Sequence, residues 1–443
     1  MRILAFTGGA GRMYCGSCLR DNALAAELIA RGHDVTLLPL YTPTRTDEAN
    51  VSEERVFFGG ISVYLEQHVP LLRRTPAILD RLWDAGPVIR AFSGRGVSVD
   101  PADLGALTVS MLEGEDGFQA KEVRKLLGWL RAQAAFDIIV LPYSLLLGLA
   151  PALKRETRRP LACTLQGEDL FLEGLPEPHR SRSKDLIRRH QASVDGFLAV
   201  SDDYADFMAG YLGIPREKVR TVPIGVSLGD FWPREARASG PFTVGYLARV
   251  APEKGLHLLA EAYRKMRERG LPPSRLWAAG YLAPEHRAYL AGIEAKVTEW
   301  GMGGEFRYHG EVDREAKAAF LRGLDVLSVP SPYVEPKGLY LLEALASGVP
   351  VVQPRHGAFP EILTRTGGGV LFAPGDADAL AEELLSLQRD PAWAQELGRR
   401  GAQGVRAHYG VARMGELALE AYAAVAAAHS ASAANSRQST VHS

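Results

Sequence analysis

Two kinds of apolar pattern alternate along most of the chain. Short runs rich in Val, Ile and Leu are too brief for helices, and they are typical of strands buried on both faces of a parallel sheet. Between them, apolar residues recur every three or four positions, as Leu24 and Leu28 do, which predicts amphipathic helices. In the first half, the runs expected to be strands lie at 3–7, 35–40, 137–141, 161–165 and 196–200.

The first expected strand leads into a glycine-rich turn at 8–11 and then a helix from about Ser17, which Gly32 is placed to end. The turn fails the dinucleotide-binding fingerprint because Tyr14 stands where a third glycine is needed. The order strand, helix, strand is nevertheless the opening of a doubly wound sheet. In the second half the same alternation returns, with expected strands at 242–247, 276–279, 306–309, 326–329, 349–353 and 370–372.

The hydrophobic pattern is interrupted between the two halves of the chain. Residues 230–241 carry two prolines and a glycine without a sustained period, so we place a linker there. The sequence thus predicts an α/β protein with a first domain over 1–230 and a second over 241–408. We expect both to be Rossmann-like, doubly wound parallel-sheet domains that face each other across a cleft, with ligands at the carboxyl ends of the strands.

Three segments fall outside this alternation. Residues from about 43 to 129 are interpreted as an insertion in the first domain, and insertions often carry specificity. A carboxyl-terminal helix over 409–428 is a candidate to pack back on the first domain. Residues 430–443 are rich in Ser, Ala and Asn and lack an apolar stripe, which predicts a disordered tail.

Composition narrows the range of partners. Of the 443 residues, 47% are hydrophobic and 23% are charged, as in soluble globular proteins. The net charge of -1 provides no field that favours nucleic acid. Three cysteines suit a reducing compartment, and no apolar run reaches the ~18 residues of a membrane span, so we expect a cytoplasmic protein.

One expected helix is locally basic. We favour the interpretation that its basic residues form a solvent-exposed face of the helix. The alternative is that they dock on anionic lipid at the inner membrane face. The residues concerned are Arg180, Arg182, Lys184, Arg188, Arg189 and His190.

Cations and carboxylates gather in two motifs of the second domain. Arg249 follows an expected strand and Lys254 opens the next helix, so both can supply the charge and donors that a leaving diphosphate needs. Glu335 lies in a loop after another strand, and Glu343 lies inside a helix that begins near Gly338. The free amides at this helix start predict an anion site. Glu343 is placed to accept hydrogen bonds from vicinal hydroxyls, while Glu335 faces the group attached to the phosphate.

Together the two motifs resemble the retaining glycosyltransferases of family four, which have the GT-B fold. The resemblance implies transfer of a sugar from a nucleotide-diphosphate-sugar donor to an acceptor that is a glycan, a lipid-linked molecule or a small molecule. It implies that Arg249 and Lys254 hold the diphosphate, that Glu335 contacts the donor sugar, and that Glu343 contacts the ribose. Arg249, Lys254 and Glu335 are therefore the catalytic candidates. Further donor-binding candidates on family-like turns are Gly8, Gly9, Val312, Gly338, Leu339 and Tyr340.

The chain also departs from the family pattern. Many members have a histidine after a strand resembling 161–165, whereas Gln166 stands there in this chain. Glutamine can hydrogen-bond a sugar hydroxyl but cannot titrate near pH 7. Glu168 and Asp169 follow directly, so Gln166, Glu168 and Asp169 are the acceptor-side candidates. The insertion over about 43–129 is the first segment in which to look for other acceptor contacts.

Two metal-like patterns are weighed against structural roles. Cys15 and Cys18 have the spacing of a metal or redox pair, but no second close Cys/His pair accompanies them, so we expect them to pack structurally. Asp376 and Asp378 form a D-x-D pattern directly before an amphipathic helix, where Asp376 is expected to be the N-cap. We therefore predict no metal and no cofactor.

Two other functions stay open at the level of sequence. One is a GT-B sugar-nucleotide epimerase or hydrolase, in which the enzyme or water replaces the acceptor, and product analysis distinguishes it. The other is a non-catalytic nucleotide-sugar-binding protein, to which Gln166 lends some support. Donor affinity without turnover on any acceptor distinguishes the binding protein.

Overall fold

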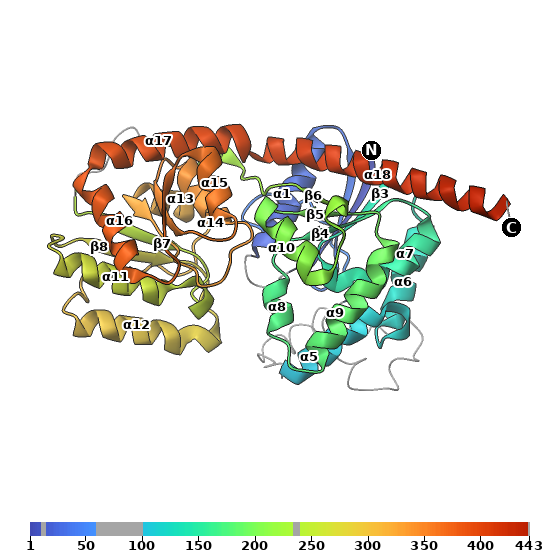
Figure 1. Cartoon of the computed structure of the whole chain (residues 1–443), viewed down its shortest axis with the longest axis horizontal. Coiled ribbons are helices and arrows are strands. Elements are labelled where there is room, and N and C mark those ends of the chain that lie inside the picture. Colours follow the sequence, from blue (N-terminus) through green and yellow to red (C-terminus); the bar gives the residue numbers. More distant parts are fainter. Residues whose placement is uncertain (10–14, 59–100, 234–239, 442–443) are drawn as a thin grey trace. The chain divides into compact units, whose positions relative to one another are not determined.

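The computed structural model describes residues 1–9, 15–58, 101–233 and 240–441. The chain divides into two compact units: unit 1 comprises Met1–Val222 and Gly415–Ser443, and unit 2 comprises Pro223–Met414. Each unit has a six-stranded sheet and a hydrophobic core of its own. Figure 1 shows the helices and strands of both units. Every pairing between neighbouring strands in the two sheets is parallel, which confirms the predicted pair of Rossmann-like α/β folds.

The sheet of unit 1 has the strand order β2-β1-β3-β4-β5-β6. Its central strands β3 and β4 are buried along their whole length, which is why they read as continuous apolar runs. The strands are β1 (Arg2–Thr7), β2 (Asp34–Pro39), β3 (Ile138–Leu141), β4 (Leu161–Leu165), β5 (Gly196–Ala199) and β6 (Val219–Thr221). The helices are α1 (Gly16–Ala30), α5 (Pro101–Glu113), α6 (Ala120–Arg131), α7 (Ala150–Thr157), α8 (Asp169–Glu173), α9 (His179–His190) and α10 (Asp202–Leu212).

The sheet of unit 2 has the order β12-β11-β10-β7-β8-β9. Figure 1 shows α11 and α12 on one face of this sheet and α14, α15 and α17 on the other. The strands are β7 (Thr243–Leu247), β8 (Arg275–Ala279), β9 (Phe306–Tyr308), β10 (Val326–Leu327), β11 (Val351–Pro354) and β12 (Gly369–Phe372). The helices are α11 (Leu256–Glu268), α12 (Arg287–Glu299), α13 (Arg314–Arg322), α14 (Leu339–Ala346), α15 (Phe359–Thr366), α16 (Ala377–Arg389) and α17 (Pro391–His408).

The last helix, α18 (Val411–Val441), begins in unit 2 and belongs to unit 1 from Gly415 onward. Tyr422 is 2% exposed, and a Cβ added at Gly196 of β5 would lie 2.7 Å from a methyl of Val425. The segment 430–443, predicted to be a disordered tail, is instead helical as far as Val441. The segment continues α18, whose earlier turns are rich in alanine, and no glycine or proline interrupts it.

The connection between the units differs from the predicted linker at 230–241. The division falls at Val222, and the residues that follow are already part of unit 2. Phe231 is fully buried in the core of unit 2, and Val226 forms a parallel bridge with Gly410. Burial of these apolar side chains outweighs the irregular sequence around them. Residues 234–239 lie outside the described residues.

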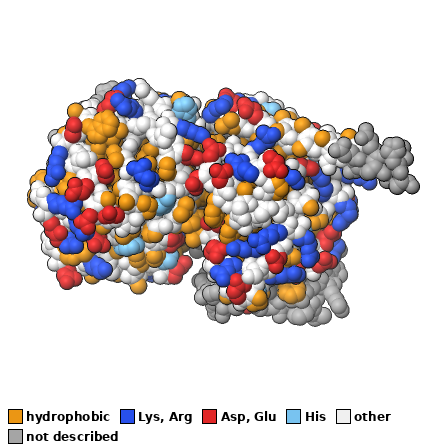
Figure 2. Space-filling view, in the orientation of Figure 1, with side chains coloured by type: hydrophobic (Ala, Val, Ile, Leu, Met, Phe, Trp, Pro, Cys, Tyr) orange, Lys and Arg blue, Asp and Glu red, His pale blue; other side chains and the backbone are white. Residues whose placement is uncertain are grey.

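The expected insertion is described only in part. Residues 59–100 lie outside the described residues, and the part that follows them forms α5 and α6. Acidic and basic side chains are interspersed over the face shown in Figure 2, in keeping with the net charge of -1. Within the described part of the chain, no helix combines the length and the apolar character needed to cross a lipid bilayer.

Candidate active site

The order of strands in unit 2 brings the two predicted motifs together. The chain passes from β7 to β8 and β9 on one side, then returns to place β10 on the other side of β7. In doubly wound sheets, ligands bind at the carboxyl edge where the direction of strand addition reverses. Arg249 and Lys254 follow β7, and Glu335 follows β10, so the cations and the carboxylate lie on the two sides of this switch point.

Lys254 and Glu335 form a buried ion pair. Lys254 Nζ donates a hydrogen bond to Glu335 Oε2, and the side chains are 14% and 6% exposed. Burial alone would raise the pKa of Glu335. The charge of Lys254, its hydrogen bond, the charge of Lys337 and the Gly338 amide together leave that pKa below its ordinary value of 4.5. Glu335 is therefore ionised at neutral pH.

The backbone around this ion pair is fixed by close contacts. Gly357 has a φ of +58°, and a Cβ at this position would lie 2.4 Å from Glu335 O. Ala358 N donates to the same oxygen at 2.9 Å. On the other side, Ser331 Oγ donates to Glu253 O at 2.8 Å, which ties the turn before Lys254 to the segment after β10. The geometry of the pair therefore depends on backbone packing as well as on attraction between charges.

Gly338 is the N-cap residue directly before α14 and has a left-handed conformation, with φ 61° and ψ 45°. Glycine adopts this region without the strain that a Cβ brings. The amides of Leu339 and Tyr340 stand in the first turn, where a helix has no intrahelical acceptors for its N–H groups. Burial and the charge of Glu335 raise the pKa of the Tyr340 hydroxyl well above its ordinary value, so Tyr340 stays a hydrogen-bond donor at neutral pH.

A second buried ion pair, which the sequence analysis missed, lies deeper under α14. Lys317 Nζ of α13 donates to Glu343 Oε1 at 2.6 Å, and the side chains are 10% and 6% exposed. The signal was a lysine on the core-facing stripe of α13, beside Phe320 and Leu321. It was overlooked because its partner becomes a neighbour only when α13 and α14 pack together.

The remaining unit 2 candidates are less enclosed. The Arg249 side chain is 41% exposed and pairs with Glu253 at 2.7 Å, while Tyr246 Oη donates to Arg249 O at 3.0 Å. The backbone of Arg249 is thus held while its side chain reaches solvent. Val312 follows β9, which β8 separates from β7, and packs against the core of unit 2.

In unit 1, Gly8 and Gly9 lie at the corresponding switch point between β1 and β3. A Cβ at Gly8 would lie 2.6 Å from the Tyr143 hydroxyl, and one at Gly9 would lie 1.9 Å from Thr42 O. These contacts give both glycines a packing role. The next residues of the turn, 10–14, lie outside the described residues.

Glu168, one of the three acceptor-side candidates, is enclosed by hydrogen-bond donors. Its Oε1 accepts from Ser144 N at 3.0 Å and Ser144 Oγ at 2.9 Å. Its Oε2 accepts from Gln166 N at 2.8 Å and Tyr204 Oη at 3.4 Å. Burial raises the pKa of Glu168 above its ordinary value, although these donors oppose the shift. The carboxylate ties the turn after β4 to the start of the 3₁₀ segment after β3 and to α10.

The other two candidates are tied to the same surroundings. Gln166 Nε2 donates to Pro142 O at 2.7 Å. The single proton of the Tyr204 hydroxyl is shared between Glu168 and Asp169, and Tyr204 Oη lies nearer to Asp169 Oδ1, at 2.7 Å. All three side chains are less than a tenth exposed. The structure therefore shows them holding the loop that follows β4, and contact with an acceptor stays a prediction.

Known proteins are similar to this chain in sequence. The family described as Glycosyl transferases group 1 matches residues 230–404, and the Glycosyl transferase 4-like domain matches residues 21–225. The lipopolysaccharide core biosynthesis mannosyltransferase LpcC of Rhizobium leguminosarum bv. viciae is 30% identical over 272 residues, which cover 59% of this chain and 70% of LpcC. The chain is a family-four glycosyltransferase.

Solved structures agree with this assignment at the level of the fold. Sucrose-phosphate synthase from Thermosynechococcus elongatus has a TM-score of 0.71 with 20% identity, over 96% of this chain and 100% of that structure. Anabaena HepE in complex with UDP has a TM-score of 0.67 with 18% identity, over the same shares of the two chains. The glycosyltransferase thus has the GT-B fold, as the motifs implied.

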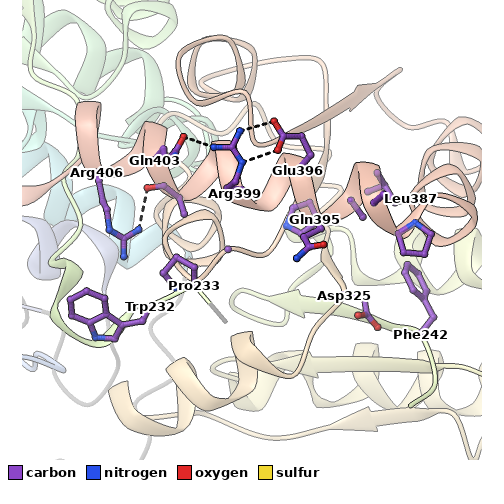
Figure 3. Close-up of a pocket in the computed structure, with 16 residues that line it drawn as sticks. Trp232, Pro233, Phe242, Asp325, Leu387, Gln395, Glu396, Arg399, Gln403 and Arg406 are labelled. Carbon is purple, nitrogen blue, oxygen red and sulfur yellow. Dashed lines mark hydrogen bonds and ion pairs between the residues drawn. The ribbon is translucent and has the colours of Figure 1, made fainter. Parts of the chain in front are cut away.

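The glycosyltransferase also has a pocket of about 840 Å³ at the opposite edge of the unit 2 sheet (Figure 3). Phe242, Asp325 and Pro350 line it, and each directly precedes a strand. Both lining arginines are engaged, Arg399 by Glu396 at 2.7 Å and Arg406 by Phe231 O at 3.1 Å. Because ligands of doubly wound sheets bind at the carboxyl ends of strands, we do not assign this pocket to the donor.

The metal-like patterns have structural surroundings. Asp376 caps α16 by accepting hydrogen bonds from the amides of Asp378 and Ala379, both at 2.9 Å, which confirms the expected N-cap. Cys15 and Cys18 are not joined by a disulfide. A hydrogen bond to Cys15 and burial raise the pKa of the Cys18 thiol far above its ordinary range. Cys18 therefore stays protonated at neutral pH.

Proposed function

We propose that this glycosyltransferase transfers a hexosyl group from a nucleoside diphosphate sugar to an acceptor hydroxyl, with retention of the anomeric configuration. The observation that carries the proposal is the buried Lys254–Glu335 pair beside the amino terminus of α14 at a sheet switch point. A cation and free helix amides suit a diphosphate, and an ionised carboxylate beside them suits sugar hydroxyls. HepE, which shares the fold, is described in complex with UDP, and this supports a nucleotide ligand.

The diphosphate is held, in this proposal, by Arg249, Lys254 and the amides of Leu339 and Tyr340. A lysine ammonium has three N–H donors, so Lys254 can keep its bond to Glu335 and still donate to a phosphate oxygen. Arg249 is exposed enough to exchange its partner Glu253 for the phosphate. Both cations then stabilise the charge that develops on the leaving group.

The reaction needs no nucleophile from the enzyme. The bond between C1 of the sugar and the phosphate oxygen breaks, and a bond from C1 to the acceptor oxygen forms on the same face. The acceptor proton passes to the departing phosphate oxygen, which balances the step. Glu335 stays ionised and orients the sugar by accepting its hydroxyl hydrogen bonds, as its low pKa allows.

For the acceptor, we propose a glycan or a lipid-linked glycan, because LpcC is named for lipopolysaccharide core biosynthesis. We leave membrane contact out of the proposal because acidic residues accompany the basic ones on and around α9. The ion pairs are Arg180–Glu177, Lys184–Glu173, Arg182–Glu113 and Arg188–Asp185.

A thermal-shift screen with UDP-, GDP- and ADP-hexoses tests the donor. A ligand at about 100 times its Kd adds about 2.7 kcal/mol to the folded state, which raises the Tm of a unit of this size by about 5 to 10 °C. We expect Glu335→Gln and Lys254→Ala to lose most of the shift. Lys265→Ala is the matched control, since Lys265 on α11 pairs with Asp378 at the surface.

The same screen decides against the proposal if no sugar nucleotide shifts the wild-type protein, or if Lys254→Ala keeps the full shift. Retention is read separately, from the anomeric configuration of the product by NMR. A product with inverted configuration overturns the retaining mechanism and leaves the donor assignment standing.

A further inference from the structure

A lysine occupies a place that helix packing would normally give to an apolar side chain. On α13, the buried residues are Lys317, Ala318, Phe320 and Leu321, so Lys317 shares the core-facing stripe of the helix. We propose that Lys317 is a positioning residue for nucleoside recognition, which fixes the Glu343 carboxylate in the orientation that distinguishes ribose from deoxyribose. The inference rests on the proposed function, in which Glu343 contacts the ribose.

Energetics favour a role beyond stability for this pair. Removing two charges from water is expensive, and replacing a buried ion pair with apolar residues is often neutral or stabilising. Lys317 and Glu343 are nevertheless 8% and 5% exposed as whole residues. A pair of this kind is explained if one partner has a further task, and only Glu343 stands on the helix that begins at the proposed diphosphate site.

Two sets of contacts hold the N-terminus of α13, the helix that bears Lys317. Asp313 caps α13 by accepting from Ala316 N at 2.9 Å. Next to it, Arg314 donates to Ser227 O at 2.8 Å and also pairs with Asp230. The helix is thus anchored at Asp313 and Arg314, three to four residues before Lys317.

The ring of Phe231 completes this support. Lys317 Nζ lies 5.7 Å from the ring centroid, while the same Nζ is 2.6 Å from Glu343 Oε1. Aromatic face and carboxylate both attract the ammonium, so its position is defined before any ligand binds. The carboxylate bound to it is defined as well, and a preorganised acceptor discriminates more sharply between hydroxyl and hydrogen than a mobile one.

The test compares ribonucleotides with their deoxy analogues by isothermal titration. The probes are UDP and 2′-deoxy-UDP, with GDP and 2′-deoxy-GDP as a second pair. A good hydrogen bond to a charged group leads us to expect about tenfold tighter binding of the ribonucleotide by wild type. In Lys317→Met the ratio should fall to below about two, while the deoxy analogue binds within about threefold of wild type. Glu343→Gln should give the same pattern, and Lys265→Met should behave as wild type.

Each outcome has a distinct meaning. If wild type does not distinguish either pair, the ribose role of Glu343 in the proposed function fails. If wild type distinguishes them and Lys317→Met keeps the ratio, or loses both nucleotides equally, the inference about Lys317 is overturned.

A second variant serves if Lys317→Met does not fold. Lys317→Arg keeps the charge but replaces a compact ammonium with a planar fork, which displaces the carboxylate. We expect its ratio to fall about threefold, with deoxy binding unchanged. A ratio equal to that of wild type overturns the inference.

Discussion

Glu168 in unit 1 and Glu335 in unit 2 are both buried carboxylates in loops that follow central strands, yet their surroundings are opposite. Glu168 is enclosed by neutral donors from Ser144, Gln166 and Tyr204, and burial raises its pKa. Glu335 is paired with the ammonium of Lys254, and its pKa is lowered. From this difference we infer that the Glu168 side chain holds a loop, whereas the Glu335 side chain is available to a ligand.

The two carboxylates differ in how their hydrogen-bonding partners leave room for a ligand. Neutral donors consume the lone pairs of Glu168 and carry no charge that a ligand can share. A lysine gives Glu335 one hydrogen bond and keeps further N–H donors for a phosphate. We therefore infer that unit 1 uses the Glu168 carboxylate to hold its fold and that unit 2 uses the Glu335 carboxylate to bind the donor.

The sharpest way to break this contrast is Lys254→Ala. Losing a hydrogen bond to a charged group is worth about 1.5 to 3 kcal/mol, so kcat/KM should fall by about 10 to 200-fold. Initial rates with the donor found in the binding screen measure the effect, with Lys265→Ala as the control. A rate within twofold of wild type removes Lys254 from the mechanism.

Glu168→Gln should act on stability instead. The amide presents N–H groups where a carboxylate oxygen accepted hydrogen bonds, so buried donors lose their acceptor and unit 1 is destabilised by about 2 to 3 kcal/mol. Urea unfolding followed by amide hydrogen exchange in β3, β4 and β5 measures the change. Nucleotide affinity of the folded variant should equal that of wild type.

The matched control for Glu168 is Glu173→Gln. Glu173 lies in the same helix–loop region but at the surface, where it pairs with Lys184 at 2.6 Å. An exposed pair is worth about 1 kcal/mol or less. If Glu168→Gln is no more destabilising than this control, or if it weakens nucleotide binding, the inference that Glu168 stabilises unit 1 without binding the donor is wrong.

A smaller effect is expected from Gly357→Ala, which displaces the backbone of Glu335 and leaves its carboxylate charge unchanged. The added Cβ meets Glu335 O at 2.4 Å in a left-handed conformation, so we expect about 1 to 3 kcal/mol of destabilisation and three- to tenfold weaker nucleotide binding. Gly375→Ala is the control, because Gly375 has a φ of +76° but open space around its Cβ position. Only stability should change there, and equal nucleotide binding by both variants contradicts the prediction.

The smallest effect is the pH dependence of stability, and it has opposite signs for the two carboxylates. Because the pKa of Glu168 is raised, its contribution to stability increases as the pH falls through its folded-state pKa toward 4.5. Because the pKa of Glu335 is lowered, its contribution is present above 4.5 and is lost as the pH falls through its folded-state pKa. Each displaced pKa unit is worth about 1.4 kcal/mol.

The pH dependence is measured from the free energy of unfolding of wild type and of each Gln variant at several pH values. The slope of the difference between them against pH gives the contribution of each carboxylate. Glu168→Gln should remove the acid-side gain, and Glu335→Gln should remove the acid-side loss. Slopes of the same sign for the two positions contradict the comparison.

Much of the fold follows from local patterns. The buried strands of both sheets are continuous apolar runs, and Lys254, Glu335 and Glu343 stand out because their spacing around strands and helices is local information. The glycine at 338 likewise signals the start of α14, which begins at the next residue.

Other features depend on contacts between distant segments. Lys317 lies 26 residues from Glu343, and Ser144 lies 24 residues from Glu168, so neither neighbour is visible in a local pattern. The switch point depends on the order of strands, which periodicity does not reveal. The segment after 430 has a polar composition that predicts disorder, and this composition does not reveal that the segment continues a helix begun at Val411.

The bridge between Val226 and Gly410 has a consequence for how such enzymes diversify. Unit 2 is a single continuous stretch, Pro223–Met414, and its two ends run side by side through that bridge. The two junctions of this continuous stretch, which we call the unit 2 cassette, are therefore already neighbours. Recombination can exchange the whole cassette without separating paired strands in either sheet. A chimera that receives the cassette of another glycosyltransferase should inherit the nucleotide preference of its source while keeping the acceptor of its host.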